Sequence, residues 1–138
     1  MYRVLLPVDT DVDRAVSQAE FVADLPVREG SVEADVAHAF TEEERDVPRT
    51  LQQLERVESV RRALEVLEDS GVETGTIGLS TPVKAAIIER AETDDFDLIV
   101  MGGRKRSPAK KALLGSVAQA TILNAPVPVA VTGMVEGT

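Results

Sequence analysis

The sequence predicts an α/β protein built on a doubly wound, five-stranded parallel sheet. Short apolar runs of strand length alternate along the chain with longer segments whose apolar residues recur every three or four positions. Several of these runs are apolar at every position, as expected for strands that are buried on both faces of a parallel sheet. Repeated strand–helix–strand units wind in one hand and cover both faces of the sheet with helices.

The first half of the chain is predicted to form two strands and two helices in alternation. Val4–Val8 is typical of a buried strand, and the acids that follow it supply N-caps and first-turn charges to a helix over residues 15–23. Proline and glycine then lead into a second strand over residues 32–40. A long helix is predicted over residues 51–67 from its leucine and valine spacing, and Gly71 ends it.

The second half repeats this alternation. Residues 72–78 alternate polar and apolar side chains, which predicts an edge strand. Thr81-Pro82 opens a helix, and Phe96–Met101 is apolar enough to be a buried strand. Gly115-Ser116 begins the next helix, and Val127–Val131 is the predicted last strand. Because ligands bind beyond the carboxyl ends of such strands, the ends of the first and fourth strands are the expected site.

Length and composition limit the class of protein. At 138 residues the chain is predicted to form one domain, residues 1–138, with a core of aliphatic side chains. It has no cysteine and one histidine, which excludes thiolate chemistry and a histidine-rich metal cluster, and we expect no metal site. It lacks an apolar run long enough to cross a membrane, and its first residues do not resemble a signal peptide. We therefore expect a soluble, cytoplasmic protein without membrane contact.

The charge balance points to a salty environment. The chain has 24 acidic and 15 basic residues and a net charge of −9, and only four of the basic residues are lysines. Acidic surfaces poor in lysine suit high-salt cytoplasm, where carboxylates stay hydrated and their repulsion is screened, so we expect a halophilic protein. The negative charge also argues against a nucleic-acid partner, which requires a broad basic face.

The segment from Gly102 to Ser116 is predicted to bind a phosphate. Gly102 and Gly103 would let the chain leave its strand with unusual backbone angles and approach a ligand closely. Gly115 and Ser116 then place N–H groups and a hydroxyl at a helix N-terminus, where the helix dipole favours an anion. Five basic residues lie between these two pairs: Arg104, Lys105, Arg106, Lys110 and Lys111.

Other nucleotide-binding and catalytic patterns do not fit. Gly115-Ser116-Val117 lacks the lysine of a Walker loop, and the first strand ends without the glycines of a dinucleotide-binding turn. Asp9 could bind an adenine amino group or a ribose hydroxyl, or cap the following helix. For His38 we favour a histidine satisfied by the backbone over a catalytic one. The acids from Glu42 to Asp46 are interpreted as a solvated loop, and no catalytic residue is predicted.

These residues resemble the universal stress protein family. That family has Gly-x2-Gly-x9-Gly-[Ser/Thr] after its fourth strand, introduced by Ile-Val-Met-Gly, and this chain has Ile99–Gly102 and Gly115-Ser116 at the same spacing. Leu5–Asp9 and Ala125–Val129 are similar to the family's first and last strands. The resemblance, to an acidic haloarchaeal-type member, covers essentially the whole chain. It implies strand order 3-2-1-4-5 in a Rossmann-like three-layer sandwich of the adenine nucleotide alpha hydrolase-like type.

The resemblance also implies a ligand: ATP or AMP, with or without Mg²⁺, bound in a stress-response or regulatory role without fast turnover. In nucleotide-binding members the aspartate after the first strand holds the adenosine, which assigns that role to Asp9. Ala39 would touch the base, Met101 and Gly102 would flank the ribose and phosphates, and residues 115–117 would bind phosphate. The full set of implied ligands is Pro7, Val8, Asp9, Ala39, Met101, Gly102, Lys105, Gly115, Ser116 and Val117.

One position departs from the family pattern. Its second glycine falls where this chain has Lys105, and Gly103 is displaced from the pattern. If a left-handed backbone is needed there, lysine is strained and could crowd a triphosphate; alternatively, it replaces lost backbone contacts with a charge-assisted one. Two alternative functions therefore stay open: a dimeric interaction module of the same fold without nucleotide, and a slow ATPase that uses His38.

The last strand predicts self-association. As the edge of the sheet, the apolar segment Val127–Val131 would expose unpaired backbone groups. In the resembled family this strand pairs across a two-fold axis, and such pairing satisfies both copies at once. We therefore expect a homodimer through this strand, the alternative being a monomer whose edge is protected by Pro126 and Pro128.

Overall fold

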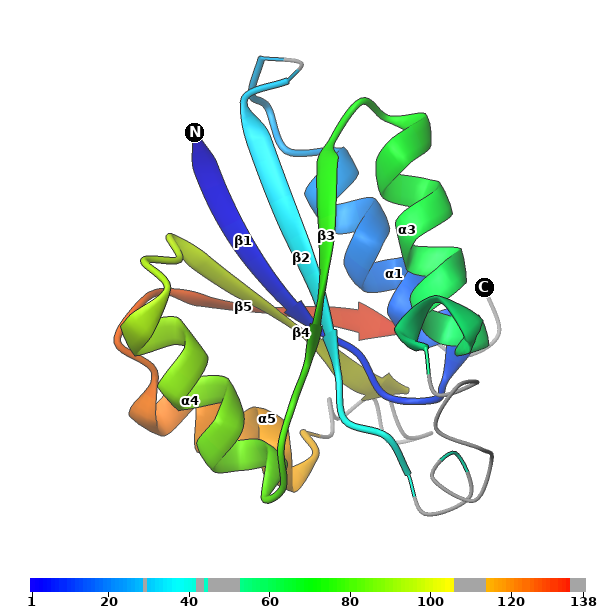
Figure 1. Cartoon of the computed structure of the whole chain (residues 1–138). Helices are drawn as coiled ribbons and strands as arrows, with labels where there is room; N and C mark the ends of the chain where they lie inside the picture. The colour runs from blue at the N-terminus through cyan, green and yellow to red at the C-terminus, as the bar shows by residue number, and fades with distance from the viewer. Residues whose placement is uncertain (29, 42–43, 45–52, 106–113, 135–138) are drawn as a thin grey trace.

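The computed structural model describes residues 1–28, 30–41, 44, 53–105 and 114–134, and in them five strands form one sheet (Figure 1). The strands are β1 (Tyr2–Pro7), β2 (Val32–His38), β3 (Glu73–Gly78), β4 (Leu98–Lys105) and β5 (Val129–Met134). The helices are α1 (Val12–Ala23), α3 (Glu58–Asp69), α4 (Val83–Thr93) and α5 (Ser116–Asn124), with a short 3-10 helix, η2 (Leu54–Arg56). All neighbouring strands are parallel and their order is β3-β2-β1-β4-β5, which confirms the predicted fold class.

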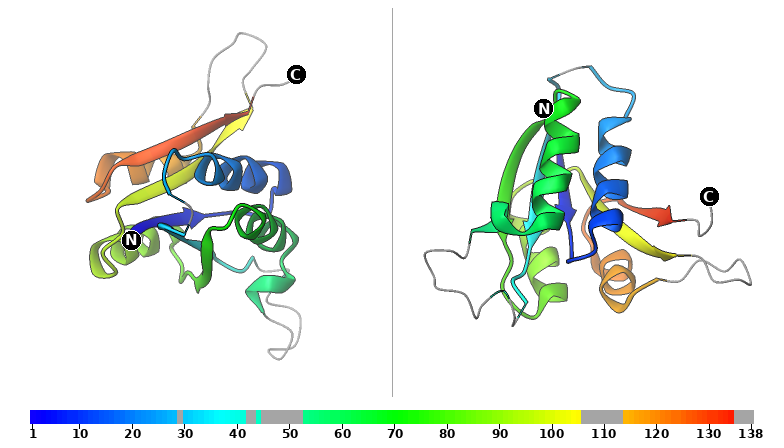
Figure 2. Two further views of the ribbon diagram at one scale, coloured as in Figure 1. Left: turned by 90° about the horizontal axis from the view of Figure 1, so that it is seen from above. Right: turned by 90° about the vertical axis from the view of Figure 1, so that its right-hand side faces the viewer.

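Helices cover the two faces of the sheet in pairs, so the protein has two apolar cores. Figure 2 shows α1 and α3 on one face and α4 and α5 on the other. The side chains of β1 alternate between the cores: Val4 and Leu6 pack with α1 and α3, whereas Leu5 packs with α4. All three are fully buried, which explains why this strand is apolar at every position.

The strand order also positions the site. From β1 the chain runs to β2 and β3 on one side, and later to β4 and β5 on the other. The connections that leave β1 and β4 therefore diverge to opposite faces, and a crevice forms beyond their carboxyl ends.

At the end of β1 and β4 opposite to this crevice, contacts between Arg3 and Asp97 hold the two strands together. The Asp97 carboxylate accepts a hydrogen bond from the Arg3 backbone N–H at 2.9 Å, and the Asp97 N–H donates to the Arg3 carbonyl at 2.8 Å. The Arg3 guanidinium lies 4.5 Å from the centre of the Phe96 ring, a cation–π distance. These contacts set the register in which Val4 pairs with Leu98.

The long helix predicted over residues 51–67 is wrong at its start. Gln53 and Val57 both have extended backbones, so the chain makes only the η2 turn between them and α3 begins at Glu58. The Thr76 hydroxyl on β3 donates to the Glu55 carboxylate at 3.2 Å and holds this turn against the sheet. Residues 51–52 lie outside the described residues. The predicted C-terminal glycine is confirmed, since Gly71 has φ 78°.

Strands β4 and β5 also differ from the prediction at their ends. β4 continues to Lys105 rather than ending at Met101, because Gly102 and Gly103 stay in the strand. A Cβ on Gly103 would lie 2.6 Å from the Thr132 carbonyl oxygen, so this glycine lets β5 approach closely. β5 begins at Val129, not Val127, since Pro128 has no N–H for the ladder; its carbonyl accepts from Ile99 at 3.0 Å.

Candidate functional site

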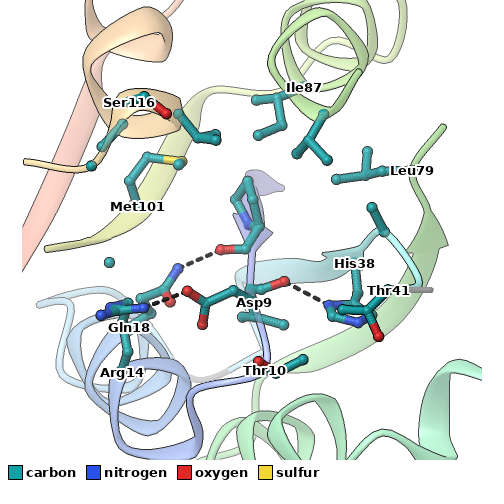
Figure 3. Close-up of a pocket in the computed structure, with 18 residues that line it drawn as sticks. Asp9, Thr10, Arg14, Gln18, His38, Thr41, Leu79, Ile87, Met101 and Ser116 are labelled. Carbon is teal, nitrogen blue, oxygen red and sulfur yellow. Dashed lines mark hydrogen bonds and ion pairs between the residues drawn. The ribbon is translucent and has the colours of Figure 1, made fainter. Parts of the chain in front are cut away.

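A cleft of about 290 Å³ lies at the carboxyl ends of β1, β2 and β4, between α1 on one side and α4 and α5 on the other (Figure 3). All of the ligand residues implied by the sequence except Lys105 line it, from three strand ends and one helix start. They are Pro7, Val8, Asp9, Ala39, Met101, Gly102, Gly115, Ser116 and Val117. The side chain of Lys105 lies outside the described part of the chain.

Side chains from three different elements fix the end of β1 at the floor of this cleft. The Gln18 amide, on α1, donates to the Pro7 carbonyl at 2.6 Å and to the Val100 carbonyl at 3.0 Å. The His38 Nδ1, on β2, lies 2.7 Å from the Val8 carbonyl oxygen, and the Ser59 hydroxyl, on α3, donates to the Asp9 carbonyl at 2.5 Å. These three side chains are almost completely buried. The backbone that carries Asp9 is therefore held on three sides.

The Asp9 carboxylate is available at the mouth of the cleft because another residue caps α1. The N-cap is Asp11, whose carboxylate accepts from the Arg14 N–H at 3.0 Å. Asp9 instead accepts from the Asp11 N–H at 2.9 Å and pairs with the Arg14 guanidinium. Its side chain is 54% exposed, so carboxylate lone pairs remain for a ligand.

The cleft has an apolar wall and a polar wall. Leu79, Val83 and Ile87 face it from the end of β3 and from α4, and Ala39 and Met101 extend the apolar surface. Figure 3 shows Leu79 and Ile87 on the side of the cleft away from Arg14, and Asp9 lies between Arg14 and these two side chains. A flat aromatic group would be buried against the apolar wall, while charged groups would be accepted on the opposite wall.

The N-terminus of α5 faces the cleft without a side-chain cap. Its N-cap residue is Gly115, with φ −69° and ψ 163°, and among the described residues no side-chain capping hydrogen bond is formed there. Ser116 is the first helical residue and is exposed on the cleft. Because Gly115 and not Ser116 is the N-cap, the start of the helix can receive an anion.

Comparison with known proteins identifies the family. The sequence profile described as "Universal stress protein family" matches residues 1–133. The chain belongs to the universal stress protein family. The universal stress protein MJ0531 of Methanocaldococcus jannaschii is 38% identical over 74 residues, which is 54% of this chain and 44% of that protein. The match thus spans less than half the length of this curated relative.

Solved structures of universal stress proteins have the same fold. The universal stress protein of Archaeoglobus fulgidus is 28% identical, covers 96% of this chain and 98% of its own, and superposes with a TM-score of 0.73. An A. fulgidus universal stress protein in complex with dAMP is 24% identical, with a TM-score of 0.68 and coverage of 96% and 98%.

In this universal stress protein, Gly102, the first glycine of the spaced motif, is needed for close packing and not for an unusual backbone conformation. Among the described residues, positive φ angles occur only at Gly30, Gly71 and Asp95, so the predicted unusual angles at Gly102 and Gly103 are absent. A Cβ on Gly102 would overlap the side-chain stem of Arg14 and would lie 2.8 Å from the Gln18 amide oxygen. Gly102 is therefore the surface over which the Arg14 side chain passes.

The backbone of this universal stress protein accommodates Lys105 without strain. The residue lies in β4 and is paired with Met134, after an irregularity in register that follows Gly102. An extended backbone suits any side chain, so the expected cost of lysine in a left-handed conformation does not arise.

His38 is buried and satisfied by hydrogen bonds, as favoured from the sequence, but its acidic neighbour was misinterpreted. The His38 Nε2 lies 3.0 Å from the Glu44 carboxylate, which also accepts from the Thr41 N–H at 2.7 Å. Burial acts to raise the pKa of Glu44, but the hydrogen bonds from Thr41 and His38 outweigh it and hold this pKa below its ordinary value. Glu44 is thus an anchored group and not part of a solvated loop.

The sequence contained signals for several residues that we did not predict. Gln18 and Ser59 lie on the apolar faces of α1 and α3, next to alanine and valine residues, and a polar side chain at such a position requires a buried partner. Thr41 and Glu44 form the reciprocal hydrogen bonds of a capping box, with the Glu44 N–H donating to the Thr41 hydroxyl at 3.2 Å. Arg14 had no comparable signal, because its role depends on the position of Gly102.

Two negative findings apply to the described residues. They contain no group of three or more His, Cys, Asp or Glu side chains placed to hold a metal ion. No helix in this part of the chain combines the length and apolarity that a membrane crossing requires.

The anchoring of β1 leads to a stability prediction. Gln18→Met keeps the side-chain length but removes the donor shared by Pro7 and Val100, leaving two buried carbonyls without it. We expect the free energy of unfolding to fall by about 1–3 kcal/mol, measured by urea denaturation. The matched control is Gln119→Met on the exposed face of α5, which should change it by less than about 0.5 kcal/mol. Equal effects of the two substitutions would refute the anchoring role.

Proposed function

We propose that this protein binds an adenine nucleotide, ATP or AMP, in the cleft and acts in a stress response or its regulation. The observation that carries the proposal is that Asp9, the uncapped start of α5 and an apolar wall all face one cleft. A nucleotide needs these three things: a surface for the base, an acceptor for ribose or amino protons, and donors for phosphate. The dAMP complex of the A. fulgidus relative supports the choice of an adenine nucleotide.

The proposed pose follows the two walls. The base lies on Ala39 and the apolar side chains of α4, Asp9 accepts hydrogen bonds from the ribose or the adenine amino group, and the phosphates point to Gly115 and Ser116. The cleft volume of about 290 Å³ is close to the lower end of ligand pockets, about 300–1,000 Å³, and suits the nucleoside part of the ligand.

A binding role without fast turnover is supported by the carboxylates of the cleft. Among the described lining residues, Asp9 is the only acid, and it is paired with Arg14. Fast phosphoryl transfer needs several positioned groups around Mg²⁺ and the attacking water. One paired carboxylate suits a binding site better, whether the nucleotide carries Mg²⁺ or not.

The homodimer expected from the sequence also remains a proposal. β5 is an edge strand of the described sheet, and its other edge pairs with β4. Large apolar side chains of the neighbouring α5 are exposed, with Leu123 82% and Ile122 43% accessible. Pairing of two β5 strands around a two-fold axis would satisfy the free edge.

The acidic, lysine-poor composition supports a halophilic, haloarchaeal-type protein that works in a salty cytoplasm. Acidic residues outnumber basic ones by 24 to 15, so the folded chain carries mutual repulsion that salt would screen.

The nucleotide proposal predicts saturable binding of ATP or AMP that depends on both walls of the cleft. Asp9→Ala removes the acceptor and Gly115→Val crowds the start of α5, and we expect each to weaken affinity about tenfold or more in isothermal titration calorimetry. Asp69→Ala, at the exposed end of α3, is the control and should leave affinity unchanged. Unchanged affinity in both cleft variants would refute the assignment. A protein with no saturable binding would favour the nucleotide-free interaction module.

The dimer proposal predicts a mass of two chains in sedimentation velocity, decreasing toward one chain on dilution. Backbone amides of residues 129–133 should exchange with deuterium more slowly in the concentrated sample than in the dilute one, because the free edge of β5 is then paired. A single-chain mass at high concentration would contradict the proposal.

The halophilic proposal predicts that the urea midpoint of unfolding rises as KCl is increased to molar concentration. At about 1 M salt the Debye length is only about 3 Å, so repulsion between surface carboxylates is almost fully screened. A midpoint that does not change, or falls, would assign the acidic composition to an ordinary low-salt protein.

A further inference from the structure

Arg14 carries a charge that the proposed nucleotide site needs and that its other described residues do not supply. It is the only lysine or arginine among the described residues that line the cleft. Its side chain is 20% exposed and lies beside Gly102 of β4, on the wall opposite the apolar side chains. Within the described residues, Arg14 is therefore the positively charged side chain that an anion in the cleft can contact.

The contacts of Arg14 fix the guanidinium but do not use all of its hydrogens. Its Nε–H donates to the Gly103 carbonyl at 3.1 Å, and one terminal nitrogen pairs with Asp9. The other terminal nitrogen lies 3.6 Å from the Asp11 carboxylate, too far for a normal hydrogen bond. A guanidinium has five N–H donors, so within the described part of the chain hydrogens on both terminal nitrogens have no partner and can be donated to a ligand.

Gly102 makes this placement possible. A Cβ there would overlap Cγ and Cδ of Arg14, so the aliphatic stem can cross β4 only where the strand has a glycine. The guanidinium is thereby held at the strand end next to Asp9 rather than extended into solvent. A preorganised arginine of this kind favours planar, two-pronged recognition of phosphate oxygens.

We propose that Arg14 is the specificity-determining residue that makes the cleft select nucleoside phosphates over nucleosides, by donating hydrogen bonds to the phosphate next to the ribose. Asp9 contacts the nucleoside part of the ligand, and the Arg14 guanidinium lies beside that carboxylate on the polar wall of the cleft. The ion pair with Asp9 neutralises the carboxylate, and the spare N–H groups bind the phosphate oxygens. This inference rests on the proposed nucleotide site and adds the residue that recognises the negative charge of the phosphate.

The test compares adenosine with AMP by calorimetry, because the two ligands differ only in the phosphate. In the wild-type protein AMP should bind more tightly than adenosine. Arg14→Met keeps the stem and removes the charge; we expect AMP affinity to fall about tenfold or more, while adenosine affinity changes less than about twofold. Gly102→Ala should reproduce this loss by displacing the Arg14 side chain. Arg61→Met, which removes an exposed charge on α3, should leave the ratio of the two affinities unchanged.

A double variant separates a direct contact from simple neutralisation of Asp9. If Arg14 acts only by cancelling the Asp9 charge, Asp9→Asn combined with Arg14→Met should restore the preference for AMP, and the proposal is wrong. If Arg14 contacts the phosphate, the preference stays lost. Equal losses for AMP and adenosine in Arg14→Met would also overturn the proposal, since Arg14 would then only position Asp9. Failure of the wild-type protein to bind either ligand would instead refute the nucleotide site itself.

Discussion

The anchoring of one strand end underlies the rest of this structure. The carbonyls of Pro7, Val8 and Asp9 lie where β1 leaves the sheet, and each meets a side chain from a different element: Gln18, His38 and Ser59. A buried carbonyl without a donor destabilises the fold by about 1–3 kcal/mol, so these three polar side chains are tolerated in the core because the strand end needs them. The consequence is a rigid floor that holds Asp9 at the mouth of the cleft.

The same end of β1 links the fold to the chemistry of the cleft through Asp9 and Arg14. Asp11 takes over the capping of α1, which releases Asp9 for pairing with Arg14. Arg14 in turn lies over Gly102 and bonds to Gly103, so α1, β1 and β4 meet at one ion pair. Partly exposed ion pairs contribute little to stability on average. The value of this one lies in placing a carboxylate and a cation next to each other at the polar wall.

The sequence was sufficient to predict the order of elements and most of the cleft, for a physical reason. Apolar periodicity reports burial, and strand ends follow from it, so Asp9 and Gly102 could be placed at one edge of the sheet. The family resemblance then assigned roles at matching positions. The predicted long helix is wrong at its start because Val57 fits the spacing of apolar residues in a helix, although its backbone is extended. Arg14 could not be predicted, since its position depends on the space above Gly102, which is 88 positions away in the chain and adjacent only after folding.

The departure at Lys105 has a different meaning once the path of β4 is known. A glycine is required where a backbone is left-handed or another group comes too close, and the extended strand at Lys105 removes the first requirement. The close approaches in this part of β4 are met by Gly102 under Arg14 and by Gly103 against Thr132. The displaced glycine of the motif is thus explained by packing against β5. The backbone at Lys105 therefore gives no argument against nucleotide binding. The arginine that we propose to bind the phosphate, Arg14, lies on α1 and not in the glycine motif.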